Sequence, residues 1–343
     1  MRAWNGQLFL VRRRLSYGEN GAVDDSGMTR AVVATAFGGP EVLSVIQTPV
    51  APPGAGEVLI SVRAAGTNPI DYKLYSGGMG RDPGRLPMRL GSEAAGVVTE
   101  AADGAEGPGG RVEAGDEVVA YPIAGAYADD VVVPVSSVVP KPSTLSFEQA
   151  SGMMLTGATA AHALAVVGPV SAGETVLIYG ASGGVGLIAV QLAVAAGARV
   201  IGTASESGHA PVREFGAEPV TYGAGLEERV RALAMRGVDA AVDCVGGDEA
   251  LDTSFALVAD RGRIVTLIAS RRAFDSGIKV IGAAPGADRG TEIRAAARLE
   301  LARLAEDGKL RVVVAATYPL AETAAAHRAL ATGHSHGKIV LVP

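Results

Sequence analysis

Seven residues near the middle of the chain have the composition of a phosphate-binding turn. Residues 180–186 read Gly-Ala-Ser-Gly-Gly-Val-Gly, and the apolar run at 175–179 leads directly into them. Clustered glycines after a strand let the backbone approach a pyrophosphate, which then sits at the positive end of the next helix. Gly183 and Gly186 match the second and third glycines of the dinucleotide fingerprint, and Ala181 stands at the first. We therefore expect a cofactor-binding turn made of Ala181, Ser182, Gly183, Gly184, Val185 and Gly186.

The segments around this turn predict an α/β fold with a doubly wound parallel sheet. A helix-length apolar run at 187–196 and a strand-like run at 199–204 complete one βαβ unit of about 30 residues. Short apolar runs and helix-length segments then alternate at 219–222, 226–235, 238–243, 248–258 and 263–268. An isolated glycine run would serve a tight turn equally well, so this alternation is what favours a dinucleotide site.

Composition narrows the classes of protein to which the chain can belong. Its 343 residues suffice for two domains, and 48% of them are hydrophobic. One cysteine, Cys244, excludes a disulfide framework, and we expect it to be a buried small apolar residue in a cytoplasmic protein. A net charge of -6 offers no basic field for nucleic acid, and no apolar run approaches the roughly 18 residues of a membrane-spanning helix. The expected partners are small molecules.

The two ends of the chain differ from its middle. Residues 1–27 carry the only tryptophan and three consecutive arginines, and we interpret them as an appendage. They are either a translated segment upstream of a working start at Met28 or an ordered arm. From 28 to about 139, short β runs alternate with Gly and Pro, which predicts a β-rich, barrel-like domain. Beyond 290, two helices and two strands are expected to return to that domain, at 292–307, 321–331, 311–315 and 338–342.

Six motifs carry a resemblance to a known family. They read FGGPEVL at 37–43, GTNPID at 66–71, GSEAAGVV at 91–98, AGDEV at 114–118, ASGGVG at 181–186 and GKIVL at 337–341. In this order they resemble the medium-chain dehydrogenases/reductases, most closely the zinc-free quinone oxidoreductase (zeta-crystallin-like) branch. The resemblance implies a GroES-like catalytic domain at 28–152 and 290–343 and a Rossmann NADPH-binding domain at 153–289, with the active site in the cleft between them. It also implies a homodimer that pairs through the edge strand at 278–282.

The residues present do not supply a zinc site. Zinc-dependent relatives use a cysteine in the first β-rich segment and the histidine of a Gly-His-Glu motif, whereas here Asn68 or its neighbour Thr67 stands near the former and Ser92 replaces the latter. Zinc needs three or four converging ligands. We therefore predict that the protein binds no metal. A solvated turn is expected for His334 and His336, and a satisfied core or interface position for His162.

Without a metal to polarise a carbonyl, hydride donation to a conjugated acceptor is the favoured chemistry. The resemblance places Asn68, Asp71 and Lys73 at the cleft. Lys73 would stabilise the developing oxyanion or relay a proton, Asn68 would orient nicotinamide or substrate, and Asp71 would hold Lys73 or the loop. Turn chemistry, helix capping and a solvated lysine are the structural alternatives for the three.

The residues after the second strand of the parallel sheet favour NADPH over NADH. Ala204 and Ser205 occupy the position where an NAD site carries an acidic residue, and Ser205 can hydrogen-bond a 2′-phosphate. Positive charge would come from His209 or Arg213, while Glu206 argues for the opposite preference. By resemblance, the remaining cofactor-binding positions are Tyr222, Thr159, Val245 and Gly246.

The sequence thus predicts a zinc-independent, NADPH-dependent oxidoreductase that transfers hydride to a quinone or a related α,β-unsaturated carbonyl. Two alternatives stay open. One is a biosynthetic enoyl or enone reductase, which Lys73 would suit because many quinone-type relatives have tyrosine at its position. The other is a crystallin-like protein that binds NADPH without turnover.

Overall fold

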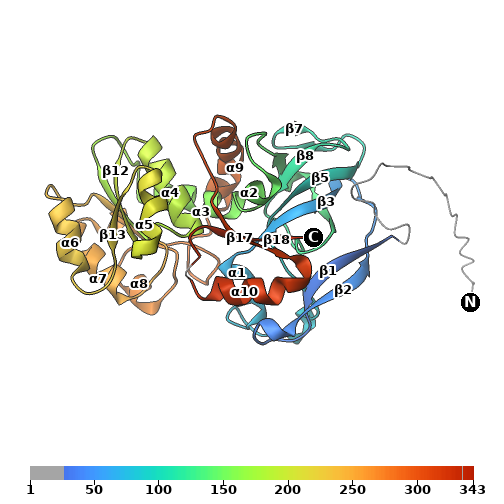
Figure 1. Cartoon of the computed structure of the whole chain (residues 1–343), viewed down its shortest axis with the longest axis horizontal. Helices are drawn as coiled ribbons and strands as arrows, with labels where there is room; N and C mark the ends of the chain where they lie inside the picture. The colour runs from blue at the N-terminus through green and yellow to red at the C-terminus, as the bar shows by residue number, and fades with distance from the viewer. Residues whose placement is uncertain (1–26, 334) are drawn as a thin grey trace, which may run out of the picture.

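The computed structural model describes residues 27–333 and 335–343. Two bodies of secondary structure lie side by side: a parallel α/β body at the left of Figure 1 and a β-rich body at the right. The interpretation of residues 1–27 as an appendage falls outside the described residues except for Gly27, which precedes the first strand.

The left body is built on a six-stranded, wholly parallel sheet. Its strand order is β13-β12-β11-β14-β15-β16, in which the chain starts at the centre and builds outward to both edges. The strands are β11 (Thr175–Tyr179), β12 (Arg199–Ala204), β13 (Glu218–Thr221), β14 (Ala240–Asp243), β15 (Ile264–Thr266) and β16 (Lys279–Val280). This is the order of a Rossmann sheet, in which ligands bind beyond the carboxyl ends of the strands at the point where the winding reverses.

Helices cover both faces of this sheet because alternate residues of its strands face opposite sides. Val176 and Ile178 of β11 belong to the core under α3 and α4, whereas Leu177 and Tyr179 belong to the core under α6 and α7. The helices are α3 (Met154–Val166), α4 (Gly184–Ala195), α5 (His209–Glu214), α6 (Leu226–Leu233), α7 (Asp248–Leu257) and α8 (Arg271–Asp275). The apolar run predicted to be a buried helix is α4, which begins at Gly184 rather than at residue 187.

The right body has a GroES-like arrangement of mostly antiparallel sheets. The larger sheet has the order β10-β8-β5-β3-β18-β17, with β9 paired to β3, and the smaller sheet has the order β2-β1-β4. Their strands are β1 (Met28–Ala34), β2 (Leu43–Pro49), β3 (Glu57–Gly66), β4 (Met88–Arg89), β5 (Ala94–Ala101), β8 (Glu117–Ala120), β9 (Asp130–Pro134), β10 (Val138–Pro140), β17 (Val314–Pro319) and β18 (Lys338–Val342). A short hairpin of β6 (Glu106–Gly107) and β7 (Gly110–Arg111) lies between β5 and β8.

The end of the chain returns to the right body, as the sequence predicted. Helix α9 (Thr291–Glu306) packs on α3, and the chain then enters the larger sheet, where β18 pairs with β17 and with β3. The strand expected at 311–315 is β17, displaced toward its C-terminal side. Two further helices, α1 (Pro69–Tyr75) and α10 (Thr323–Ala331), lie against each other beside β18, and α2 (Phe147–Ser151) leads into α3.

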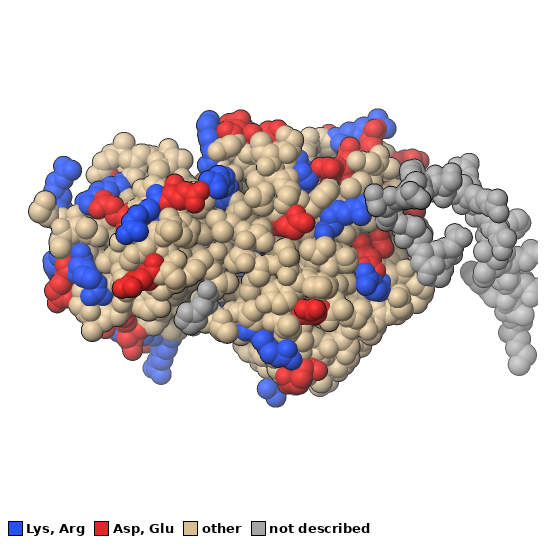
Figure 2. Space-filling view, in the orientation of Figure 1, with Lys and Arg blue, Asp and Glu red and all other residues tan. Residues whose placement is uncertain are grey.

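The surface carries charges of both signs. On the face shown in Figure 2, Lys and Arg are interspersed with Asp and Glu, and neither sign forms a broad continuous area. Among the described residues, no helix combines the length and the apolar character needed to cross a lipid bilayer.

Candidate active site

A cleft of about 640 Å³ lies between the two bodies, at the carboxyl ends of β11, β12 and β14. The parallel body contributes the glycine turn, the residues after β12 and the loop after β14. The other body contributes the segment from β3 into α1 and the segment from α10 into β18. The lining includes Thr67, Asn68, Tyr72, Lys73, Thr156, Ser182, Gly183, Gly184, Val185, Gly186, Ser205, Tyr222, Cys244, Val245, Gly246, His336 and Lys338.

The glycine turn forms one wall because only glycine fits two of its positions. Gly180 has φ +68°, a left-handed conformation that other residues avoid. A Cβ on Gly186 would lie 2.1 Å from the Gly180 carbonyl oxygen, so a side chain there would displace the start of α4. The amides of the first turn of α4 have no partner within the helix. They and the helix dipole give this wall the donors and the positive potential that an anion would need, and its binding of a diphosphate stays a prediction.

The loop after β14 is held by a buried carboxylate. Asp243 is 1% exposed, and its Oδ1 accepts from the amides of Val245 at 3.0 Å and Gly246 at 2.8 Å. Thr266 Oγ1 donates to the other oxygen, Oδ2, at 2.7 Å. Cys244 is partly exposed to the cleft, so its expected full burial is wrong. Its surroundings still raise the pKa of the thiol, chiefly by desolvation and secondly through the charge of Asp243, and the thiol therefore stays protonated at neutral pH.

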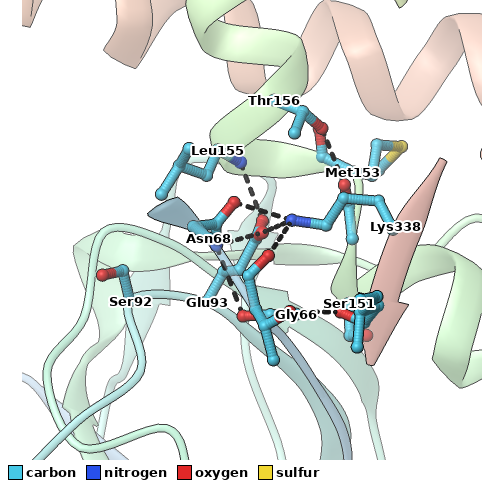
Figure 3. A network of polar contacts seen from close by, with 12 residues as sticks. Gly66, Asn68, Ser92, Glu93, Ser151, Met153, Leu155, Thr156 and Lys338 are labelled. Carbon is cyan, nitrogen blue, oxygen red and sulfur yellow. Dashed lines mark hydrogen bonds and ion pairs between the residues drawn. The ribbon is translucent and has the colours of Figure 1, made fainter. Parts of the chain in front are cut away.

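The opposite wall carries Asn68 in a fixed orientation. Its Nδ2 donates to Glu93 Oε1 at 3.0 Å, and its Oδ1 accepts from Lys338 Nζ at 2.7 Å (Figure 3). Lys338 Nζ also lies 3.1 Å from Glu93 Oε1 and donates to the Thr67 carbonyl at 2.8 Å. Glu93 Oε2 accepts from the Leu155 amide at the start of α3. A buried amide or charged group is costly without a hydrogen-bond partner, and Asn68, Glu93 and Lys338 supply these partners to one another.

Asp71 stands behind this wall and does not hold Lys73, which corrects one of the roles expected for it. Its Oδ2 accepts from the backbone N–H of Asn68 at 2.8 Å and from Tyr127 Oη at 2.7 Å, and Ser92 Oγ donates to Oδ1 at 3.2 Å. It does hold the loop that presents Asn68, which is the other expected role. Burial raises the pKa of Asp71 to about 6 against the opposing effect of these hydrogen bonds.

A buried chain of rings continues from Asp71 to α10. Tyr127 Oη lies 3.3 Å from His327 Nε2, and His327 Nδ1 lies 2.9 Å from Tyr75 Oη. Burial lowers the pKa of His327 to about 4, so the imidazole is neutral at pH 7. Because Tyr127 donates to Asp71, its oxygen accepts from His327 Nε2–H, and His327 Nδ1 then accepts from Tyr75. This series of hydrogen bonds, from Tyr75 through His327 and Tyr127 to Asp71, thus connects the loop that carries Asn68 to α10.

Lys73 lies on α1 and lines the cleft, as expected. Its side chain is partly exposed, and its ammonium has no hydrogen-bond or ion-pair partner among residues 27–333 and 335–343. A free ammonium beside a fixed amide is an arrangement that can stabilise or protonate an oxygen on which negative charge develops.

The structure brings some of the other predicted cofactor residues to the cleft and leaves others outside it. Ser205 and the half-exposed Tyr222 line it. Ala181 is fully buried beneath the glycine turn, and Thr159 donates to the Leu155 carbonyl along α3. His209 lies 3.4 Å from Thr221 Oγ1, and neither it nor Arg213, which is exposed on α5, lines the cleft. Both residues lie on the short α5, and His209 contacts Thr221 at the end of β13 rather than the cleft.

Three residues of the site have roles that sequence reasoning missed. Glu93 and Lys338 lie inside motifs that carried the family resemblance, and a charged residue in an otherwise apolar motif was a signal for a buried pair. His336 was expected in a solvated turn but lines the cleft. His334 is outside the described residues. His162 is fully buried and lies 3.1 Å from Asp288 Oδ2, which confirms the expected satisfied histidine.

Comparison with known proteins agrees with this architecture. A family model described as an alcohol dehydrogenase GroES-like domain matches residues 54–143, and one described as a zinc-binding dehydrogenase matches residues 215–341. A quinone oxidoreductase of Mus musculus is 33% identical over 334 residues, which cover 92% of this chain and 98% of the relative. The chain belongs to the medium-chain dehydrogenases/reductases. The match over nearly the full length of the mouse protein places it in the quinone oxidoreductase branch, whose members are oxidoreductase enzymes.

Solved structures of this family superpose closely on the chain. The Escherichia coli quinone oxidoreductase complexed with NADPH has a TM-score of 0.79 at 30% identity, and the match covers 92% of this chain and 100% of that one. A structure described as an NAD-dependent alcohol dehydrogenase has a TM-score of 0.79 at 32% identity and covers 92% and 99%. The family thus includes proteins described with either nicotinamide cofactor.

Zinc, which one family model names, does not fit the donors of this medium-chain dehydrogenase/reductase. Residues 27–333 and 335–343 contain no group of three His, Cys, Asp or Glu side chains arranged to hold a metal ion. Ser92, at the position where the resemblance implies a zinc-binding histidine, uses its hydroxyl to donate to Asp71. A serine hydroxyl is not among the usual ligands of zinc in proteins.

Proposed function

We propose that the chain is an NADPH-dependent reductase of quinones or related α,β-unsaturated carbonyls that works without zinc. The observation that carries the proposal is the pairing of two walls across one cleft. An amide-lined glycine turn faces a fixed Asn68 and the free ammonium of Lys73. The complexes of similar proteins with NADPH support the choice of cofactor.

Each wall has its own task in this reaction. When bound, the reduced nicotinamide supplies a hydride to the electron-poor carbon of the acceptor. The first-turn amides of α4 hold the diphosphate, and the loop of Val245 and Gly246 borders the nicotinamide half. Asn68 orients the reactants through the remaining lone pair of Oδ1, because its Nδ2 already donates to Glu93 and to the Gly66 carbonyl and Oδ1 already accepts from Lys338. Lys73 donates a proton or a hydrogen bond to the acceptor oxygen, where negative charge accumulates.

The proposal is tested by turnover. The purified protein is incubated with NADPH and a panel of quinones, enones and enoyl thioesters, and the loss of nicotinamide absorbance is followed. We expect quinones or simple enones to give the highest kcat/KM. Preference for enoyl thioesters would favour the biosynthetic alternative, and tight NADPH binding without turnover would favour the non-catalytic one.

We also propose that the chain forms a homodimer through β16. Lys279–Val280 is the edge strand of the parallel sheet, paired on one side with β15. The Val280 carbonyl and the Gly282 amide are bonded to Asp288 on the outer side, so a second copy of the chain would pair with the backbone groups of this edge that Asp288 leaves free. Light scattering on the eluting protein is expected to give twice the mass of one chain, and the mass of a single chain at micromolar concentration would contradict the dimer.

A further inference from the structure

His336 connects two loops of the parallel body from the other side of the cleft. It lies in the segment between α10 and β18, and its Nδ1 is 3.2 Å from Ser182 Oγ in the glycine turn. Its Nε2 is 3.0 Å from Ser207 Oγ, which is in turn 3.0 Å from Ser205 Oγ. Ser182 is only 9% exposed, and the hydroxyls of the three serines form with the His336 imidazole a hydrogen-bonded polar corner of the cleft.

This corner is where the adenosine ribose of a dinucleotide meets the end of the second strand. Ser205 directly follows β12, the position from which a Rossmann sheet reads the ribose 2′ substituent. A 2′-phosphate placed here needs positive charge as well as hydroxyl donors.

His336 is the side chain able to supply that charge. Among the described residues that line the cleft, the basic ones are Lys73, Lys338 and His336. Lys338 is engaged by Glu93 and Asn68, and Lys73 projects from α1 on the wall of Asn68. His209 and Arg213, the candidates from the sequence, do not line the cleft.

We propose that His336 determines the preference for NADPH, by pairing its protonated imidazole with the 2′-phosphate while Ser205 and Ser207 donate hydrogen bonds to the same group. The proposal rests on the function proposed above and adds to it the residue that reads the 2′ position. The imidazole exchanges its hydrogen bonds with the serines for contacts with the phosphate.

A histidine gives this preference a pH dependence that lysine or arginine would not. Histidine side chains change charge between about pH 5 and 8, whereas lysine and arginine stay charged throughout this range. The other titratable groups on the elements that meet His336 are Glu206 on η4 (Glu206–Gly208), His209, Arg213 and Glu214 on α5, and Lys338 on β18. A phosphate monoester is largely dianionic above its second pKa of about 6, so a change above pH 6.5 reports mainly on the protein. The preference should weaken as the pH rises.

The test is titration calorimetry with NADP⁺ and NAD⁺ at pH 6.5 and 8.5. For the unmodified protein, we expect the ratio of the NAD⁺ Kd to the NADP⁺ Kd to fall about tenfold between the two pH values. His336→Gln should lower the ratio at pH 6.5 about tenfold through weaker NADP⁺ binding alone and leave it independent of pH. His336→Lys should keep a high ratio at both pH values. The matched control, His209→Gln, should behave like the unmodified protein.

The outcomes separate this inference from the proposed function. If neither nucleotide binds to the unmodified protein, the proposed function fails. If NADP⁺ binds tightly but its preference is the same at both pH values, or is unchanged in His336→Gln, the role of His336 is refuted while the function stands. The comparison of Kd ratios at pH 6.5 and 8.5 uses the unmodified protein, so the test does not depend on the folding of any variant.

Discussion

At the scale of single residues, the cleft separates fixed groups from a free one. Asn68 is held by Glu93, Lys338 and the carboxylate of Asp71, so it has one orientation available. Lys73 has no partner among the described residues and can move toward a bound acceptor. A rigid amide suits positioning, and a mobile ammonium suits transfer of a proton or stabilisation of a negative charge.

Lys73→Ala tests this division. We expect kcat for the best acceptor to fall roughly 100-fold, because a positioned proton donor typically contributes 10²–10⁴-fold, while the Kd of NADPH changes less than about twofold. Steady-state rates and calorimetric binding provide the two numbers. Lys309→Ala, at an exposed lysine that does not line the cleft, is the control. An unchanged kcat in Lys73→Ala would mean that Lys73 is an ordinary solvated lysine without a catalytic role.

Asp71→Asn tests the buried carboxylate through pH. The pKa of Asp71 is about 6 in the folded protein and about 4 when unfolded, so the fold favours its protonated form. The stability that this group contributes is fully present below about pH 4 and is lost as the pH rises through 6. We expect the asparagine variant, which does not titrate, to gain about 2 kcal/mol relative to the unmodified protein between pH 4 and pH 7. Denaturant unfolding at four pH values measures this, and a difference that is independent of pH would contradict the assignment.

At the scale of elements, the glycine turn and α4 form one unit. The turn is tight because a side chain at 186 would collide with the Gly180 carbonyl, and this closeness brings the first amides of α4 to the cleft. Gly183, in contrast, has an ordinary φ of -78°, so its role lies in what approaches it from the cleft rather than in its own backbone.

Gly183→Glu should therefore separate binding from folding. The added carboxylate would occupy and repel the diphosphate site, and we expect the Kd of NADPH to rise at least about 100-fold. The backbone conformation at 183 tolerates a side chain, so the thermal midpoint should stay within a few degrees of the unmodified value. Calorimetry and thermal unfolding provide the two measurements. Retained affinity would mean that the diphosphate binds elsewhere.

The sequence predicted these elements because their signals are local. Apolar runs, glycine placement and spacing along the chain located β11, β12 and α4 within a few residues of their observed ends. The contacts of Lys338 and His336 with Asn68, Glu93, Ser182 and Ser207 join residues 129 to 270 positions apart, and no local pattern encodes such distances. His209 was predicted because relatives often have lysine at its position, and Arg213 as a further source of positive charge, but both lie on α5 and neither lines the cleft.

At the scale of the whole molecule, the cleft depends on one buried pair that ties distant segments together. Glu93 contacts Asn68 before α1, the Leu155 amide in α3 and Lys338 at the start of β18 (Figure 3). These segments belong to both bodies, so the pair fixes how the walls face each other. The domain limits predicted at 152/153 and 289/290 place Glu93 and Lys338 in one domain and Leu155 in the other, and these limits stay a prediction.

Removal of one member of this pair should be costly. In Glu93→Gln, Lys338 keeps its charge at 5% exposure without a counter-ion, and we expect a loss of about 3 kcal/mol of unfolding free energy. Adding Lys338→Met should recover part of that loss, which denaturant unfolding can measure as a coupling energy. Glu300→Gln breaks the exposed contact with Arg303 and should cost less than about 1 kcal/mol. Strict additivity of the Glu93 and Lys338 changes would contradict a shared buried contact.

Zinc-independent hydride transfer is tested by measuring quinone reduction by NADPH on protein of known zinc content. The protein is treated exhaustively with a chelator, its zinc is quantified by elemental analysis, and the initial rate of NADPH oxidation with a naphthoquinone is recorded before and after zinc is added back. Because hydride transfer is proposed to need no metal, we expect full turnover with far less than one zinc per chain and no gain on addition. Loss of turnover on chelation that added zinc restores would contradict it.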